Sequence, residues 1–303
     1  MLALFGPTAA GKSAVAHALA REVGGEIVVA DPFQRYRGLE IAADAPRSPE
    51  RAEVPYHLVG DLDLAADSTA GDFAARAHAA IDAIRGRGRV PIVAGGTGLY
   101  LRAALCELDM RPPPDPTVRA WAEELARRPA AALAELEARD PRAAAAVDRA
   151  NPRRIARALE RAATGEGAGP GDIWAAPSRL PSMVACVERP ADVLDALIVD
   201  RVRREVAEGL VDELRAALAR DDLARGPRQV IGMAEVEAMD RGEMHRDDLE
   251  ARLVARTRRL ARMQRTWMRR MHVDLVVDLA DRDAASGACV IAAAWRRARD
   301  GVV

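Results

Sequence analysis

The chain has 303 residues, of which 50% are apolar and 30% are charged, and its formal net charge is −1. This length predicts one large domain or two of ordinary size with a substantial core. No segment reaches the roughly 18 uncharged apolar residues of a membrane helix, and the three widely spaced cysteines fit neither a disulfide framework nor a metal knuckle. Membrane, secreted, collagenous and disordered classes are therefore excluded, and a cytoplasmic protein without a signal peptide is expected.

Short apolar runs alternate with segments of helical periodicity in the first third of the chain, and two further apolar runs follow later. Each run has the length of a buried strand, and each periodic segment places its apolar residues on one helix face. The predicted strands are residues 2–5, 26–30, 90–94, 183–187 and 275–277, and the predicted helices in this part are residues 13–23 and 72–85. This alternation predicts the α/β class, with a parallel sheet flanked by helices on both faces.

The composition changes between these two groups of strands. Residues 111–116 are rich in proline and predict a linker. Residues 118–163, rich in Ala, Leu, Glu and Arg, predict several helices, and residues 164–170 then break the pattern. A further helical region covers residues 192–270. We therefore predict two domains, which are an α/β core of residues 1–110 and 182–303 and an inserted all-helical domain of residues 111–181.

The strongest motif is a complete P-loop between the first predicted strand and the first predicted helix. Its glycines let the backbone wrap a phosphate, and amide groups at the helix N-terminus point at the anion. Lys12, the only lysine in the chain, adds a point charge, and the Ser13 hydroxyl is the predicted ligand of a Mg²⁺ ion. The predicted phosphate-binding residues are Gly6, Pro7, Thr8, Ala9, Ala10, Gly11, Lys12 and Ser13.

Two polar residues follow the neighbouring strands. A nucleoside-triphosphate hydrolase commonly places an acid at the end of a second buried strand, but here the strand at 90–94 ends in Gly-Gly-Thr-Gly. The acid is Asp31, which follows the strand after the P-loop helix. Because the carboxyl ends of parallel strands converge on one crevice, we expect Asp31 and Thr97 to face the bound phosphate.

Taken together and in order, several segments resemble the tRNA dimethylallyltransferase (tRNA isopentenyltransferase) family. The segments that carry the resemblance are residues 6–13, 31–39, 95–101, 115–119, 151–160, 229–232 and 257–267. The P-loop alone is generic, whereas the ordered set is specific to this family. Members transfer a dimethylallyl group from its diphosphate to the exocyclic amine of an adenosine beside the tRNA anticodon.

The resemblance implies a role for each polar residue around the P-loop. The loop would hold dimethylallyl diphosphate rather than ATP, with Mg²⁺ as cofactor, and Lys12 would help to neutralise the leaving group. Asp31 would bind the adenine amine and accept its proton as general base. Thr97 would lie in the channel where base and prenyl group meet. Arg201, aligned with an arginine of a later family helix, would complete the clamp on the diphosphate.

A stacked anticodon-arm adenosine must be turned out of its stack to enter a buried channel, so a large basic surface is expected. Arg149, Arg153, Arg157 and Arg161 are spaced four apart and predict one stripe along a helix of the insert. Eight arginines and no acid occur between residues 251 and 273, so pairing within that helix is not available. Phosphate contact therefore explains both arrays better than surface ion pairs do. The residues assigned to tRNA are Asp31, Pro32, Phe33, Gln34, Thr97, Arg119, Arg153, Arg154, Ile155, Ala156, Arg157, Gln229, Gly232, Arg258 and Arg262.

The chain departs from the family pattern at several supporting positions. The family's Asp-Ser is Asp31-Pro32 here, and its Gly-Thr-Ala-Lys-Pro is Ala-Ala-Asp-Ala-Pro at residues 42–46. Its Gly-Tyr-Lys is Gly-Met-Ala at residues 232–234, and the arginine expected before Gln264 is Met263. We predict a divergent but competent enzyme that is a monomer.

Three other functions remain compatible with the sequence. A P-loop small-molecule kinase shares the motif, but the Gly-Gly-Thr-Gly strand end and the arginine arrays weigh against it. An isopentenyltransferase acting on free adenine nucleotides would use the same catalytic set, although the helical insert favours a macromolecular substrate. A non-catalytic tRNA-binding relative would need neither Lys12 nor Asp31, and both are present.

Overall fold

The computed structural model describes residues 1–108, 115–165 and 173–301, and the chain divides into two compact units. Most of the predicted linker at 111–116 and of the predicted break at 164–170 lies outside the described residues. The first unit comprises residues 1–107 and 178–303, and the second comprises residues 108–177. The chain leaves and re-enters the first unit at one place, because Cys106 forms an antiparallel bridge with Ser178.

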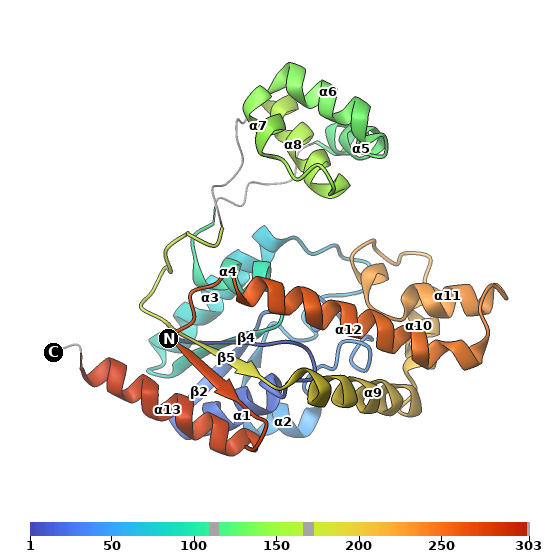
Figure 1. The fold of residues 1–303 in the computed structure, drawn as a ribbon. Coiled ribbons are helices and arrows are strands. Elements are labelled where there is room, and N and C mark those ends of the chain that lie inside the picture. Colours follow the sequence, from blue (N-terminus) through green and yellow to red (C-terminus); the bar gives the residue numbers. More distant parts are fainter. Residues whose placement is uncertain (109–114, 166–172, 302–303) are drawn as a thin grey trace. The chain divides into compact units, whose positions relative to one another are not determined.

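A six-stranded parallel sheet forms the centre of the first unit (Figure 1). Its strands are β1 (Leu2–Phe5), β2 (Gly25–Val29), β3 (Tyr56–His57), β4 (Val90–Gly95), β5 (Met183–Glu188) and β6 (Leu275–Asp278). Their order is β3-β2-β4-β1-β5-β6, so β1 lies inside the sheet with Leu4 opposite Ala94 of β4 and Ala185 of β5. All of β1 is buried, as a strand covered on both faces requires. The predicted α/β class and its five strands are confirmed, whereas β3 was not predicted.

Helices cover both faces of this sheet. Figure 1 shows α1 (Lys12–Val23) and α13 (Ala284–Asp300) on one face, and α3 (Ala70–Gly86), α4 (Gly98–Leu105) and α12 (Leu249–Met268) on the other. The remaining helices of the unit are α2 (Ser48–Glu53), α9 (Ala191–Ala207), α10 (Leu210–Leu218), α11 (Met233–Asp240) and the 3₁₀ turns η1 (Pro227–Gln229) and η2 (Arg246–Asp248). No helix among the described residues is long and apolar enough to cross a bilayer.

A second apolar cluster lies beside the P-loop end of the sheet. It joins the end of α9, α10, α11 and the start of α12 around Leu214, Val236 and Leu253. The segment after β2 packs on the same cluster through Tyr36 and Leu39. This packing places α9 and α12 next to the segment that follows β2, so residues far apart in the sequence surround one space.

The second unit is helical and has its own core. Its helices are α5 (Pro116–Ala126), α6 (Pro129–Arg139), α7 (Pro141–Ala146) and α8 (Pro152–Thr164). Each begins with a proline, which suits the first helical position because its missing N–H has no helical partner there. The core contains Leu136, Ile155 and Leu159, all fully buried. The predicted helical insert is confirmed as a structural feature.

Candidate active site

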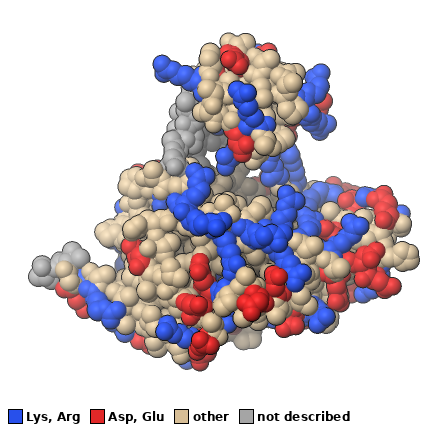
Figure 2. All heavy atoms as spheres, in the orientation of Figure 1, with Lys and Arg blue, Asp and Glu red and all other residues tan. Residues whose placement is uncertain are grey.

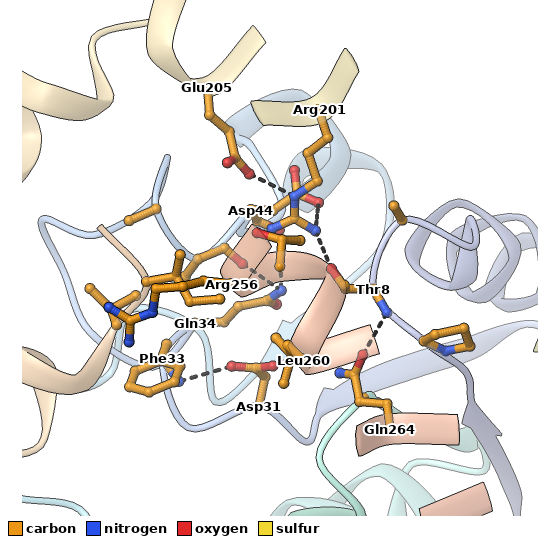
Figure 3. Close-up of a pocket in the computed structure, with 18 of the residues that line it drawn as sticks. Thr8, Asp31, Phe33, Gln34, Asp44, Arg201, Glu205, Arg256, Leu260 and Gln264 are labelled. Atoms are coloured by element: carbon orange, nitrogen blue, oxygen red, sulfur yellow. Dashed lines mark hydrogen bonds and ion pairs between the residues drawn. The ribbon is translucent and has the colours of Figure 1, made fainter. Parts of the chain in front are cut away.

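A cavity of about 650 Å³ lies in the first unit beside the carboxyl ends of β1 and β2. The P-loop forms one wall, and the segments after β2 form a second. Helices α9 and α12 supply further walls (Figure 3), and residues 229–231 before α11 also line the cavity. Since the carboxyl edge of a parallel sheet is where such folds bind ligands, this cavity is the candidate active site.

The P-loop conformation depends on its small residues. Gly11 has a φ of +94° and Ala9 a φ of +63°, and these left-handed positions turn the loop back on itself before α1 begins. A Cβ at Gly6 would lie 2.5 Å from the carbonyl oxygen of Val187 on β5, so only glycine fits there. The predicted residues Pro7, Thr8, Ala9, Gly11, Lys12 and Ser13 line the cavity, and Gly6 and Ala10 are buried behind it.

Lys12 and Asp31 bring opposite charges into this enclosed space. Burial lowers the pKa of Lys12, and the charge of Asp31 opposes that shift. Burial likewise raises the pKa of Asp31, against the stabilising backbone N–H groups of Phe33 and Gln34 and the charge of Lys12. The Phe33 N–H donates to Asp31 Oδ1 at 2.9 Å and so fixes the carboxylate after the strand end. A carboxylate with a raised pKa is a better proton acceptor than an ordinary aspartate.

Arg201 on α9 reaches the P-loop, as the sequence resemblance implied. Its Nη1 donates to Thr8 Oγ1 at 2.8 Å, and its Nε donates to Glu205 at 2.6 Å (Figure 3). Asp44 lies 3.0 Å from the same Nη1. Burial lowers the pKa of Arg201, but the charges of Asp44 and Glu205 outweigh it and raise the pKa overall. The guanidinium therefore stays charged at the edge of the phosphate loop.

Gln264 is a site residue that sequence reasoning missed. It is 3% exposed on α12, and its Oε1 accepts a hydrogen bond from the Thr8 N–H at 2.7 Å. A Cβ at Gly96 would lie 2.3 Å from Gln264 Nε2, so the glycine after β4 leaves the room that this amide occupies. One signal was present in the sequence, because Gln264 interrupts the apolar face that includes Leu253 and Ala261.

Asp44, Glu205 and Arg256 also line the cavity without having been predicted. Glu205 follows Arg201 by four residues, a spacing that favours an ion pair on a helix and was readable in the sequence. Arg256 donates to both carboxylate oxygens of Glu235 on α11 at 2.9 Å. The position of Asp44 could come only from the tertiary structure, because its partners lie on α9.

The residues assigned to tRNA separate into two groups in the first unit. Asp31, Phe33, Gln34 and Gln229 line the cavity, and Gln34 Nε2 also bonds the carbonyl oxygens of Ala43 and Asp44 at 3.1 Å. The others lie outside the cavity lining, and they are Pro32, Thr97, Gly232, Arg258 and Arg262.

Two of the residues outside the lining have a clear structural setting. Thr97 is the N-cap residue of α4 beside Gly96, which does line the cavity, and its side chain makes no capping hydrogen bond. Gly232 is buried at the start of α11 with a φ of +106°, and a Cβ there would lie 2.6 Å from Leu214. The backbone and the packing therefore explain the glycine at position 232.

The eight arginines between residues 251 and 273 lie on α12 and just after its end. Figure 2 shows basic side chains gathering on the drawn face of the first unit around this helix. Arg256 pairs with Glu235, and Arg258 Nε lies 3.4 Å from Asp195 on α9, so neighbouring helices supply acids that α12 itself lacks. Arg259 and Arg262 are exposed. The predicted lack of acids concerned pairing within the helix, and acids of α11 and α9 nevertheless pair with Arg256 and Arg258.

The arginine stripe predicted at residues 149–161 is shorter in the structure than the sequence suggested. Arg149 precedes α8, so the helical stripe consists of Arg153, Arg157 and Arg161 only. Arg157 pairs with Glu160, which is 4% exposed. Ion pairing thus accounts for one of the arginines that the sequence assigned to phosphate contact.

Three more residues of the second unit were assigned to tRNA through the resemblance. Ile155 and Ala156 are 0% and 4% exposed in the helical core, and this corrects the expectation that their side chains contact tRNA. Arg119 Nε lies 3.7 Å from the buried Glu160 and shares it with Arg157. The exposed basic side chains at the start of α8 are Arg153 and Arg154.

The predicted Mg²⁺ ligand Ser13 lies on the cavity wall in the first turn of α1. The described residues contain no cluster of three His, Cys, Asp or Glu side chains that could hold a metal by themselves. Mg²⁺ usually keeps several waters and binds one or two protein oxygens together with phosphate oxygens. A single hydroxyl beside a phosphate loop therefore fits this ion, provided that the ligand brings its own oxygens.

The parallel sheet, the P-loop after β1 and the charged cavity define a P-loop enzyme that binds a phosphorylated ligand. A sequence profile of the IPP transferase family matches residues 34–271, and a profile of isopentenyl transferase matches residues 1–54. A tRNA dimethylallyltransferase of Anaeromyxobacter sp. (strain K) is 44% identical over 274 residues, or 89% of this chain and 90% of that protein. One of Deinococcus radiodurans is 39% identical over 88% of this chain and 89% of its own length. The chain belongs to the IPP transferase family.

Solved structures agree with this assignment. The full-length tRNA isopentenylpyrophosphate transferase of Bacillus halodurans matches with a TM-score of 0.71 and 30% identity, covering 97% of this chain and 95% of that one. A eukaryotic dimethylallyltransferase acting on tRNA matches with a TM-score of 0.75 and 22% identity, covering 93% of this chain and 74% of that one. The similarity to the eukaryotic enzyme, at 22% identity, shows a shared fold.

Proposed function

We propose that this enzyme transfers a dimethylallyl group from dimethylallyl diphosphate to the exocyclic amine of an adenosine beside the tRNA anticodon. The observation that carries the proposal is the convergence of the phosphate loop, Asp31 and Arg201 on one cavity. Prenyl transfer to an amine needs a group beside the phosphate loop that accepts the proton of the amine, and Asp31 lies there. The similar proteins named as tRNA dimethylallyltransferases support the same substrate pair.

The first half of the reaction depends on charge. The allylic carbon–oxygen bond breaks, and its electron pair leaves with the diphosphate. Lys12, Arg201 and the P-loop line the part of the cavity where this negative charge would grow. Fixed donors of this kind lower the barrier because they are oriented before the bond breaks. A Mg²⁺ ion held by Ser13 and phosphate oxygens would supply further neutralisation of the leaving group.

The second half of the reaction depends on Asp31. The adenine amine forms the new nitrogen–carbon bond and must lose a proton as it does so. Asp31 stands in the same cavity as the P-loop, with one oxygen fixed by the Phe33 N–H, and its carboxylate is the acceptor that we assign. Thr97, which starts α4 next to the cavity, is proposed to contact the base.

Analysis of nucleosides by mass spectrometry tests the function. Unmodified tRNA incubated with the protein, Mg²⁺ and dimethylallyl diphosphate should yield an adenosine heavier by one dimethylallyl group in place of a hydrogen. Free adenosine monophosphate under the same conditions should remain unmodified. Modification of the nucleotide but not of tRNA would assign the enzyme to free nucleotides instead. Consumption of ATP with a metabolite and no prenyl transfer would assign it to the kinases.

We also propose that the exposed arginines at the start of α8 contact tRNA phosphates. Replacing Arg153 and Arg154 by Gln should flatten the plot of log affinity against log salt by about one to two units, because each neutralised phosphate contributes roughly 0.7–0.9. Titrations of one tRNA at several salt concentrations measure this slope. Arg154 itself lies 3.8 Å from Asp148, so the matched control also uses arginines with acidic neighbours. Replacing Arg127 and Arg139, which pair with Glu124 and Glu135 away from α8, should leave the slope unchanged. Parallel lines for both double variants would remove α8 from the RNA interface.

We propose further that the enzyme acts as a cytoplasmic monomer. The three cysteines are free thiols, two of them buried, as is typical of a reducing compartment. Sedimentation equilibrium at micromolar concentration measures the oligomeric state, and a dimeric mass would contradict the proposal.

A further inference from the structure

One carboxylate in the cavity works against anion binding. Asp44 lies between β2 and α2, and its Oδ2 is 3.0 Å from Arg201 Nη1, the nitrogen that also donates to Thr8 Oγ1 (Figure 3). Its Oδ1 lies 3.6 Å from Arg204 on the same helix. Because Thr8 belongs to the P-loop, the nitrogen that Asp44 contacts is one that also reaches the loop expected to hold a phosphate.

The fold holds Asp44 at this position. Its φ is +50°, a left-handed conformation that few residues other than glycine, Asn and Asp adopt easily. Its N–H donates to the Ile41 carbonyl oxygen at 3.1 Å, and its own carbonyl oxygen accepts from Gln34 Nε2 at 3.1 Å. Glu213 accepts hydrogen bonds from the backbone N–H groups of Ile41 and Ala42 at 2.9 and 2.8 Å. The loop is therefore anchored on both sides of the carboxylate.

The side chain of Asp44 is more exposed to solvent than that of its partner. Asp44 is 40% exposed, whereas its partner Arg201 is 17% exposed and tied to Glu205 through Nε. A diphosphate in the P-loop carries at least two negative charges and would compete for the same guanidinium nitrogen. The arginine cannot easily leave, so the aspartate is the group that yields.

We propose that Asp44 is an internal counter-ion of the phosphate clamp. Its carboxylate occupies Arg201 in the ligand-free enzyme, is displaced when the diphosphate binds, and promotes release of pyrophosphate after transfer by taking the arginine back. This inference rests on the proposed diphosphate substrate, but it concerns anion affinity alone and not the prenyl chemistry.

Asp44→Asn tests the proposal with little change of shape, because Asn also tolerates a positive φ. Titration calorimetry with inorganic pyrophosphate and Mg²⁺ measures the affinity without tRNA or a prenyl group. We expect Asp44→Asn to bind pyrophosphate about three- to tenfold more tightly, since a partly exposed charge contributes a modest share of binding. The same variant should show stronger product inhibition by pyrophosphate during turnover.

Asp240→Asn is the matched control. Asp240 is 41% exposed and bonds Arg215 at 2.6 Å, but it does not line the cavity, so its replacement should leave the affinity unchanged. Thermal unfolding of both variants shows that each is folded. In an Arg201→Gln background the gain from Asp44→Asn should disappear, because coupled residues give non-additive effects.

Equal or weaker pyrophosphate binding by folded Asp44→Asn would overturn the proposal, as it would show that Asp44 only supports the clamp. A gain that persists in full without Arg201 would overturn it as well. A different set of results would contradict the proposed prenyl transfer while leaving the role of Asp44 intact. In that case tRNA would gain no prenyl group, while Asp44→Asn would still bind pyrophosphate more tightly than the unchanged enzyme.

Discussion

Lys12→Ala is expected to abolish prenyl transfer while tRNA binding stays largely intact. Lys12 is the first residue of α1, lines the cavity, and is the only lysine of the chain. Removing a single preorganised donor to a developing anion typically costs about 10²–10³ in rate. Lys12 also carries a full charge, so the loss should exceed about 10³-fold. Single-turnover transfer measures the rate, and gel-shift titration measures tRNA affinity.

A variant that loses one positive charge outside the cavity serves as the control for this experiment. Arg296 on α13 pairs with Glu22 at 2.8 Å and does not line the cavity. Arg296→Ala should therefore transfer at the unchanged rate. Near-normal transfer by Lys12→Ala would show that the phosphate group binds elsewhere.

Asp31→Asn is expected to slow transfer by about 10²–10⁴-fold, which is the usual contribution of a general base. The amide keeps the size of the carboxylate and can still bond the adenine amine, but it cannot accept a proton. The loss should therefore appear in the single-turnover rate and much less in tRNA affinity. Asp63→Asn, which removes an exposed carboxylate bonded to Arg220 at 2.9 Å, should leave the rate unchanged. An unchanged rate in Asp31→Asn would remove Asp31 from the chemical step.

The pH dependence gives a second readout of Asp31. Only the ionised carboxylate accepts a proton, and burial raises its pKa above the ordinary aspartate value. The value of kcat/KM should therefore be full above this raised pKa and fall as the pH drops through it. The fall should begin at a higher pH than the range near 3.9 that is typical of an exposed aspartate. In Asp31→Asn this acidic limb should be missing from the residual activity.

The elements that the sequence identified are those with a strong local signal. The strands at residues 2–5 and 90–94 are continuous apolar runs, because strands covered on both faces have no polar side to alternate with. The P-loop is recognisable because its glycines meet a local backbone requirement, which the positive φ of Gly11 shows. By contrast, β3 has only two residues, too few to show a period, and the buried face of α13 consists largely of small residues such as Gly287, Ala288 and Ala292, which give a weak apolar signal.

The residues of the candidate site also fall into those with a local signal in the sequence and those without one. The sequence placed Lys12, Ser13 and Asp31 on one crevice, because strand ends in a parallel sheet converge whatever the rest of the chain does. Arg201 came from the resemblance and not from any local pattern. Gln264, 256 residues from its partner Thr8, was found only in the structure. Contacts of this kind depend on how α9 and α12 pack beside the P-loop, and no short stretch of sequence encodes that packing.

By itself the sequence determined the α/β class, the helical insert, the phosphate loop and the acid beside it. Each of these follows from residues adjacent in the chain or from a fixed rule of parallel sheets. Only the tertiary structure decided which charges are free to act. Arg258 looks in the sequence like any other basic residue of an acid-free helical segment, yet it lies 3.4 Å from Asp195 of α9. Asp44, an ordinary loop residue in the sequence, lies against the phosphate clamp. Apart from pairs one turn apart on the same helix, the partner of such an ion lies on another element, so it is fixed by how distant elements pack.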